Sequence, residues 1–184
     1  MNRAEAYALL TEYTKKNGLI KHALAVEGVM RDYARKTGED EESWGIVGLV
    51  HDFDYERYPS AEAGHPYKGA EILREKGVPA EWVDAVLGHG SYTGVKRESA
   101  MAKTLFAVDE LTGFIVAVAL VRPDKKLEGV SVQSVKKKMK DKTFAASVSR
   151  EDIVKGAEHI GVPLDEHIDF VLASMKKIAP ALGL

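Results

Sequence analysis

The sequence contains no cysteine among its 184 residues. This absence excludes disulfide bonds, cysteine-ligated zinc fingers, iron–sulfur clusters and thiol catalysis. Any metal site must therefore be built from histidine, carboxylate and water. The chain also carries little net charge, −2 at pH 7, whereas a general nucleic-acid-binding domain is normally clearly basic. We expect no general binding to nucleic acid.

Long apolar runs are missing as well. The most apolar stretch, residues 113–121, is far shorter than the about 20 residues that a membrane-spanning helix needs. The N-terminus has no continuous apolar segment of the kind found in signal peptides. We therefore expect a cytoplasmic protein with no membrane partner. A chain of this length suits a single domain, residues 1–184.

The alternation of apolar and polar residues that indicates a strand is scarce, whereas apolar residues recur at three- and four-residue steps along most of the chain. This pattern predicts an all-α fold, a single-domain helical bundle. A loop is predicted over residues 53–64, and Asn17-Gly18 and Gly38 are predicted to end the first two helices. The predicted helices cover residues 3–16, 19–36, 41–52, 67–75, 79–90, 98–121, 131–139, 150–159 and 165–178.

His51 and Asp52 follow the apolar run Trp44–Val50, which is expected to lie in the core. Burying an ionised carboxylate without a partner is costly, so a metal ion or a cation usually accompanies it. A histidine beside an aspartate at a helix end is also found without any metal. The dipeptide alone is therefore weak evidence for a metal site.

Six polar residues occupy positions where the pattern predicts buried or constrained side chains. Each has an ordinary explanation by itself, since a lone histidine on an apolar helix face is more often a hydrogen-bonded core residue than a ligand. Together they come from five segments and have complementary ligand chemistry, which favours a metal site. The six are His22, His51, Asp52, His65, His89 and Asp109.

The order of these residues resembles the HD-domain superfamily of metal-dependent phosphohydrolases. The stretch His65–Leu73 is similar to the HP-x-x-GAEIL helix of HDIG-type members, and Leu87-Gly88-His89 lies where those members place another histidine. The resemblance covers about residues 19–120 and leaves a helical C-terminal extension over about 131–184. The chain departs from HDIG proteins after Asp52, where Phe53-Asp54-Tyr55 replaces Ile-Gly and a lysine. It also lacks the GYP signature of cyclic-dinucleotide phosphodiesterases.

The resemblance implies one or two divalent transition metal ions, of Fe, Mn, Co, Ni or Zn. His22, His51, Asp52 and Asp109 would hold the first ion. Asp52 would bridge to a second ion held by His65 and His89, and is the expected catalytic residue. Such a site would activate water to hydrolyse a phosphomonoester or phosphodiester, such as a nucleotide or another small phosphate ester.

Two other functions are compatible with the same ligand set. Some HD-fold proteins, such as myo-inositol oxygenase, use four histidines and two aspartates to hold two irons that activate dioxygen. A non-catalytic nucleotide- or metal-binding regulator is the second alternative. The sequence determines neither the physiological substrate nor the oligomeric state.

Substrate contacts are expected from cations near the site in sequence, namely Arg57, Lys68 and Arg122. Each could neutralise phosphate oxygens, but each could equally be a solvated surface residue. The lysine-rich run around residues 136–142 keeps helical spacing and is predicted to be a solvated face. His159 and His167 lie in charged surroundings outside the resemblance, and we leave them out of the site.

Overall fold

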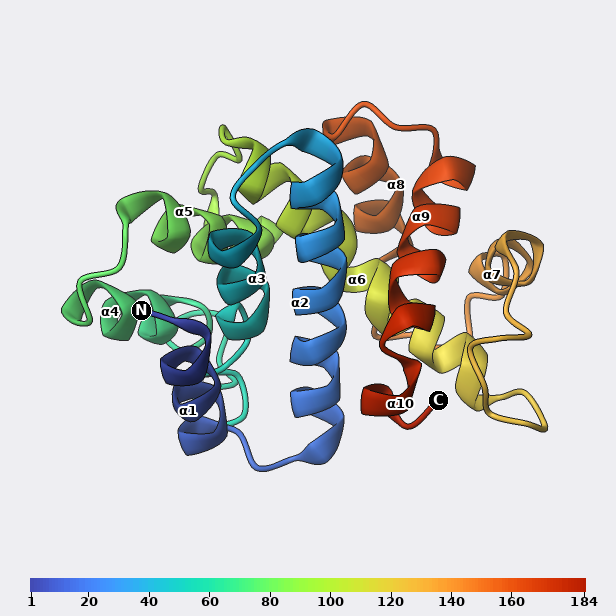
Figure 1. Cartoon of the computed structure of the whole chain (residues 1–184), viewed down its shortest axis with the longest axis horizontal. Helices are drawn as coiled ribbons and strands as arrows, with labels where there is room; N and C mark the ends of the chain where they lie inside the picture. The colour runs from blue at the N-terminus through green and yellow to red at the C-terminus, as the bar shows by residue number, and fades with distance from the viewer.

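The computed structural model describes all 184 residues as a helical protein without strands (Figure 1). The predicted all-α fold is confirmed. The helices are α1 (Arg3–Tyr13), α2 (Asn17–Thr37), α3 (Glu41–Val50), α4 (Tyr67–Glu75), α5 (Ala80–His89), the 3-10 turn η1 (Ser91–Thr93), α6 (Ala100–Leu120), α7 (Val132–Met139), α8 (Arg150–His159), α9 (Leu164–Lys177) and α10 (Ala179–Leu182).

The two longest helices, α2 and α6, form the centre of the molecule. Figure 1 shows α2 upright between α3 and α9, with α6 running behind them. Helix α6 also packs against α5 and α8. One continuous hydrophobic cluster extends from Leu10 in α1 to Met175 in α9. The helices after residue 130 therefore share the core built by the first six helices.

Most helix bounds follow from local signals. Helix α4 has the predicted bounds, and Gly77, with φ +69°, follows its end. Helix α2 ends at Gly38, whose φ of +77° is the left-handed conformation that glycine adopts without strain. Ser131 caps α7 by accepting the backbone N–H of Ser134. The short helix α10 was not predicted.

The first helix boundary differs from the prediction. Helix α1 ends at Tyr13, and Asn17 and Gly18 begin α2 instead of ending α1. Tertiary contacts explain the difference. The hydroxyl of Thr14 donates to the carbonyl of Phe53 at 2.9 Å, and the Glu56 carboxylate accepts the backbone N–H groups of Lys15 and Lys16 at 2.8 and 2.9 Å. These bonds fix residues 14–16 outside the helix and tie α1 to the segment that follows Asp52.

Helices α6 and α8 approach each other closely at Gly156. A Cβ added at this position would lie 2.5 Å from the Cα of Ala107 in α6. We expect Gly156→Ala to push the helices apart and to lower the free energy of unfolding by about 1–3 kcal/mol, as overpacking does. Urea denaturation measures the change. The control is Gly113→Ala within α6, where an added Cβ meets nothing within 4 Å and should stabilise the helix. Equal effects at both positions would contradict the packing argument.

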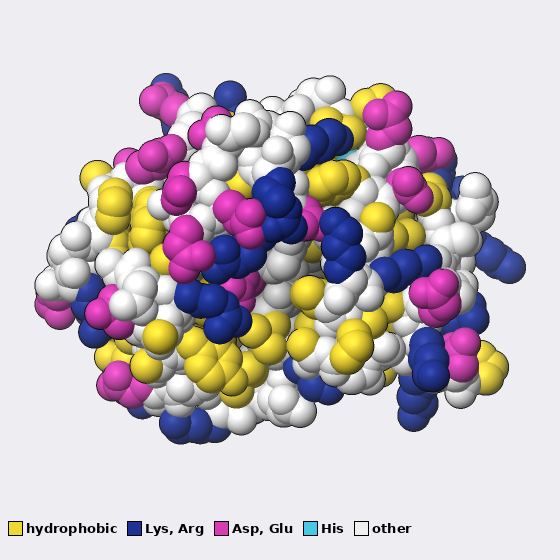
Figure 2. Space-filling view, in the orientation of Figure 1, with side chains coloured by type: hydrophobic (Ala, Val, Ile, Leu, Met, Phe, Trp, Pro, Cys, Tyr) yellow, Lys and Arg dark blue, Asp and Glu magenta, His cyan; other side chains and the backbone are white.

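The surface carries charges of both signs. Figure 2 shows acidic and basic side chains interspersed over one face, with hydrophobic side chains between them. Below the surface, the buried Glu27 forms ion pairs with Arg3 at 2.6 Å and Arg31 at 3.0 Å. None of the helices is both long enough and apolar enough to span a membrane.

Candidate metal centre

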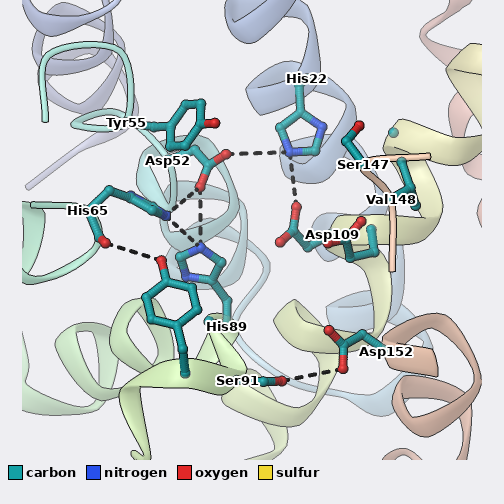
Figure 3. Close-up of a pocket in the computed structure, with 14 residues that line it drawn as sticks. His22, Asp52, Tyr55, His65, His89, Ser91, Asp109, Ser147, Val148 and Asp152 are labelled. Carbon is teal, nitrogen blue, oxygen red and sulfur yellow. Dashed lines mark hydrogen bonds and ion pairs between the residues drawn. The ribbon is translucent and has the colours of Figure 1, made fainter. Parts of the chain in front are cut away.

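The six candidate ligands meet in one place although they come from five segments. His22 lies in the second turn of α2, His51 and Asp52 directly follow α3, His65 precedes α4, His89 ends α5, and Asp109 lies in the middle of α6. Figure 3 shows five of these side chains turned toward a common pocket. The sixth, His51, is fully buried and does not line the pocket.

Two of the histidines, His22 and His51, contact Asp109. The Nε2 atom of His22 lies 3.0 Å from Asp109 Oδ1 and 3.2 Å from Nε2 of His51. The Nε2 atom of His51 lies 3.4 Å from the same Asp109 oxygen and 3.5 Å from Asp52 Oδ1. His22, His51 and Asp52 form one group that could hold a metal ion, with Asp109 in direct contact with both histidines.

A second group shares Asp52 with the first. The Nε2 atoms of His65 and His89 each lie 3.2 Å from Asp52 Oδ1 and 3.1 Å from each other. Asp52, His65 and His89 are the second set of side chains close enough to bind one metal ion. Asp52 is the single residue common to both sets, which is the position a bridging ligand occupies.

The spacing of these atoms fits metal coordination. Ligand atoms about 2.1 Å from a common ion lie about 3.0 Å apart in an octahedral arrangement and about 3.4 Å apart in a tetrahedral one. The nitrogen and oxygen atoms of the second group are 3.1–3.2 Å apart, and those of the first group, taken with Asp109, are 3.0–3.9 Å apart. The donor set therefore matches a transition metal in chemistry and in spacing.

In three of the imidazole rings, the second nitrogen, Nδ1, also has a hydrogen-bond partner. The Nδ1 of His51 donates to the carbonyl of Gly48 at 2.8 Å, and the Nδ1 of His89 donates to the carbonyl of Val86. Each carbonyl lies near the end of a helix, where backbone acceptors have no intrahelical partner. The Nδ1 of His65 donates to Asp54 Oδ1 at 2.7 Å. These bonds direct Nε2 of each ring toward the site, as in metal-binding histidines.

The charges in the cluster also favour a cation. Burial opposes ionisation of Asp52 and Asp109, but the charge of His51 and the hydrogen bonds from neighbouring imidazoles outweigh it and lower the pKa of both carboxyls. Burial likewise opposes protonation of His89, but the hydrogen bond to Asp52 and the charge of that carboxylate raise its pKa to about 9. In the metal-free protein, protons therefore occupy the positions that a metal ion would take.

This competition predicts that metal affinity depends on pH. The pKa of His89 in the metal-free fold is raised above its ordinary value of 6.5 to about 9, so a bound metal must displace a proton at neutral pH. We expect the apparent affinity to rise by about tenfold per pH unit up to about pH 9 and then to level off. Competition with a chelator of known proton affinity measures it. An affinity that is constant from pH 7 to 9 would contradict the assignment of His89 as a ligand.

Asp54 holds the second group in place, a role that the sequence analysis did not predict. Its side chain is fully buried and accepts hydrogen bonds from Nδ1 of His65 and from the backbone N–H of Gly69, both at 2.7 Å. A Cβ added at Gly69 would lie 2.9 Å from the Asp54 carboxyl carbon, so glycine is required for this approach. Only the position of Asp54 two residues after Asp52 hinted that it would lie near the site.

Asp54→Asn tests this supporting role. The carboxylate accepts hydrogen bonds from His65 Nδ1 and from the Gly69 N–H, one at each oxygen. The amide has a single oxygen, so its NH2 group would face one of these two donors, and this should turn the His65 ring. We expect metal affinity to fall by about 10–100-fold, the usual effect of losing a hydrogen bond to a ligand. The control is Asp84→Asn on the exposed face of α5. Unchanged affinity in Asp54→Asn, measured by chelator competition, would show that the contact does not orient His65.

A pocket of about 420 Å³ opens beside the cluster (Figure 3). Apart from the ligands, Glu110 and Asp152 contribute carboxylates, and Ser91 and Ser147 contribute hydroxyls. Burial and the charge of Asp109 raise the pKa of Glu110 to about 7. Sequence reasoning missed Ser147 and Asp152 because they lie beyond the segment that carries the resemblance.

The three cations expected to contact substrate do not line this pocket. Arg57 donates to the carbonyl of Glu12 at 3.1 Å and lies over the ring of Tyr13. Lys68 pairs with Glu71 at 2.7 Å, one turn along α4. Arg122 pairs with Asp124 at 3.0 Å, two residues further along the chain. Each is engaged by a neighbour outside the pocket.

His167 is not in the charged surroundings that the sequence suggested. It is fully buried, its Nε2 donates to the carbonyl of Ala107 at 2.9 Å, and its Nδ1 accepts the hydroxyl of Tyr33 at 2.6 Å. That prediction was wrong because the apolar face of α9 packs on α2 and α6, which buries the ring. Burial lowers its pKa, and the residue lies outside the metal cluster.

A family model described as HD domain matches residues 19–113. The chain belongs to the HD-domain family. The matched segment contains every residue of the metal cluster, and the family is one of metal-dependent hydrolases. A search of curated proteins and a search of solved structures found no match. In this HD domain, the pocket walls at Ser147 and Asp152 come from residues beyond the matched segment.

Proposed function

We propose that this HD domain is a metal-dependent phosphohydrolase that acts on a nucleotide or another small phosphate ester. The observation that carries the proposal is the arrangement of two ligand groups that share Asp52 at the wall of a 420 Å³ pocket. A volume of this size is within the range of small-molecule sites. His22, His51, Asp52 and Asp109 would hold one ion, and Asp52, His65 and His89 a second.

The ions would be divalent Fe, Mn, Co, Ni or Zn, one or two per chain. When bound, they supply an activated water and positive charge for the phosphoryl oxygens. The chain itself contributes the orientation of the ligands, through Asp54 and the carbonyls of Gly48 and Val86. Asp52 is the proposed catalytic residue because its carboxylate lies between the two groups.

The charge of the pocket makes phosphate binding depend on metal. Asp52, Asp109, Glu110 and Asp152 all line it, and no lysine or arginine does. A phosphate group entering the metal-free pocket would therefore meet carboxylates. Removal of the metal should abolish turnover and should abolish binding of a phosphate group in this pocket.

Release of inorganic phosphate from a panel of nucleotides and other phosphate esters tests the proposal. The protein is loaded in turn with each candidate ion, and His22→Gln is purified in parallel to detect contaminating phosphatases. Turnover in the wild type that is lost with a chelator and in His22→Gln would support the proposal. No turnover of any ester at full metal occupancy would contradict it, and binding without turnover would support a regulatory role instead.

A di-iron oxygenase is the second candidate, and the pocket lining gives a reason to test it. The carboxylates of Glu110 and Asp152 and the hydroxyls of Ser91 and Ser147 are suitable partners for a polyol. The iron-loaded protein would then consume dioxygen in the presence of a polyol or a phosphonate. Oxygen uptake that requires both iron and the organic compound would favour this function over hydrolysis.

A further inference from the structure

A second hollow lies next to the metal-centre pocket and has the opposite charge. It has a volume of about 360 Å³ and shares Ser91 with the first pocket. Its charged or titratable side chains are Lys96, Arg97, Lys103 and His159, and no carboxylate lines it. The carboxylate-lined pocket and the cation-lined hollow therefore meet at one serine.

Arg97 is fixed in this hollow without an acidic partner. Its Nε donates to the carbonyl of Gly88 at 2.6 Å, its Nη2 donates to the hydroxyl of Ser91 at 2.9 Å, and its guanidinium lies 3.5 Å from the centre of the Phe106 ring. Its Nη1 makes no hydrogen bond within the protein, and no carboxylate lies within 4.0 Å of the guanidinium. A partly buried guanidinium held this way leaves donors for an external anion.

Two lysines face the same space and are also free of ion pairs. Lys96 precedes Arg97 and is exposed, and Lys103 lies in the first turns of α6, the 21-residue helix that begins after Ser99. Three cations without ion pairs, Lys96, Arg97 and Lys103, therefore line one hollow.

The connection to the metal centre is direct. Gly88, which accepts from Arg97, immediately precedes the candidate ligand His89. Ser91, which accepts from the same guanidinium, donates to Asp152 at 3.3 Å on the wall of the metal-centre pocket (Figure 3). A molecule bound at the metal centre could extend past Ser91 to the cations.

We propose that this hollow is an anion subsite that binds a second phosphate group of the substrate. The proposal rests on the proposed phosphohydrolase function and narrows its substrate class to phosphate esters that carry a further anionic group. The metal ions would neutralise the phosphoryl group that is hydrolysed, and Lys96, Arg97 and Lys103 would neutralise the other. Two separate sources of positive charge suit a substrate with two separate anionic groups.

Inorganic phosphate added to the metal-free protein tests the subsite without any turnover. In this state the metal-centre pocket holds carboxylates and the protonated His89, so the position of the NMR shifts, and not binding alone, assigns the phosphate to the cationic hollow. We expect backbone amide NMR signals of residues 91–103 to shift and the affinity to fall on the order of tenfold in the double variant Lys96→Gln, Lys103→Gln. The control is Lys137→Gln, an exposed lysine of α7. No binding, or equal affinity in the double variant, would overturn the subsite.

Kinetics of the metal-loaded protein test the role of the subsite in substrate selection. The KM values of a nucleoside bisphosphate and of the corresponding monophosphate are compared. In the double variant, the ratio by which KM favours the bisphosphate should fall by on the order of tenfold. An unchanged preference would overturn the role in selection. If neither ester is hydrolysed while phosphate still binds to the metal-free protein, the anion subsite stands and the proposed phosphohydrolase function fails.

Discussion

Asp52→Ala is expected to abolish hydrolysis and to reduce metal binding at both ligand groups. The carboxylate of Asp52 is the one side chain that lies within 4 Å of all four histidines of the cluster. Losing a hydrogen bond to a metal ligand already costs about 10–100-fold, so losing a shared ligand should cost more, on the order of 10³-fold or greater in kcat/KM. Phosphate release under saturating metal measures the effect.

The control for Asp52→Ala is Asp84→Ala, which removes an exposed carboxylate of α5. A separate readout, which needs no bound metal, shows whether the contact between Asp52 and His89 is lost. The hydrogen bond to Asp52 is the main contribution that raises the pKa of His89 to about 9, so the pKa of His89 in the metal-free variant should fall. NMR titration of the imidazole measures this. Full activity in Asp52→Ala would contradict the site as described.

Phe53→Ala is expected to lower the free energy of unfolding by about 3–5 kcal/mol, the usual cost of truncating a buried phenylalanine. The Phe53 ring is fully buried and meets the edge of the Tyr13 ring at a centroid distance of 5.2 Å. Its carbonyl accepts the hydroxyl of Thr14 at 2.9 Å. Because Phe53 directly follows Asp52, its packing also fixes the turn that presents the shared carboxylate, and metal affinity should fall as well.

Urea denaturation of the metal-free protein measures the loss without the stabilising effect of bound ions. The matched control is Tyr55→Ala in the same segment, where the ring is 43% exposed. We expect this variant to lose about 1 kcal/mol or less. A similar loss in both variants would show that the segment does not depend on the Phe53 ring for its stability.

Sequence periodicity was sufficient to predict the all-α fold and most of its helices. The bounds of α4 and α8 were predicted correctly because Pro66, Gly77 and Ser149 mark their ends locally. The end of α1 was not, because the contacts that remove residues 14–16 from the helix come from Phe53 and Glu56, about 40 residues away. No local pattern carries that information.

The candidate site shows the same contrast between residues with a local sequence signal and residues whose role depends on distant contacts. Its six candidate ligands are predictable from the sequence because they are histidines and aspartates on apolar faces, in an order similar to a known family, and the structure brings them together. Asp54, which supports His65, was missed because a carboxylate in a turn gives no sign of its burial. Arg57 and Lys68 were chosen for closeness in sequence, which does not determine the direction of a side chain. The cations of the neighbouring hollow come from residues 96–103 instead.

The most direct test of the two ligand groups is the metal content per chain, measured by elemental analysis of the wild type and of His89→Ala after loading and removal of free metal. Close to two transition metal ions in the wild type and close to one in His89→Ala is the expected result, because His89 belongs to only one group. The same metal content in both proteins would contradict the second group. No bound metal in the wild type would contradict the metal centre itself.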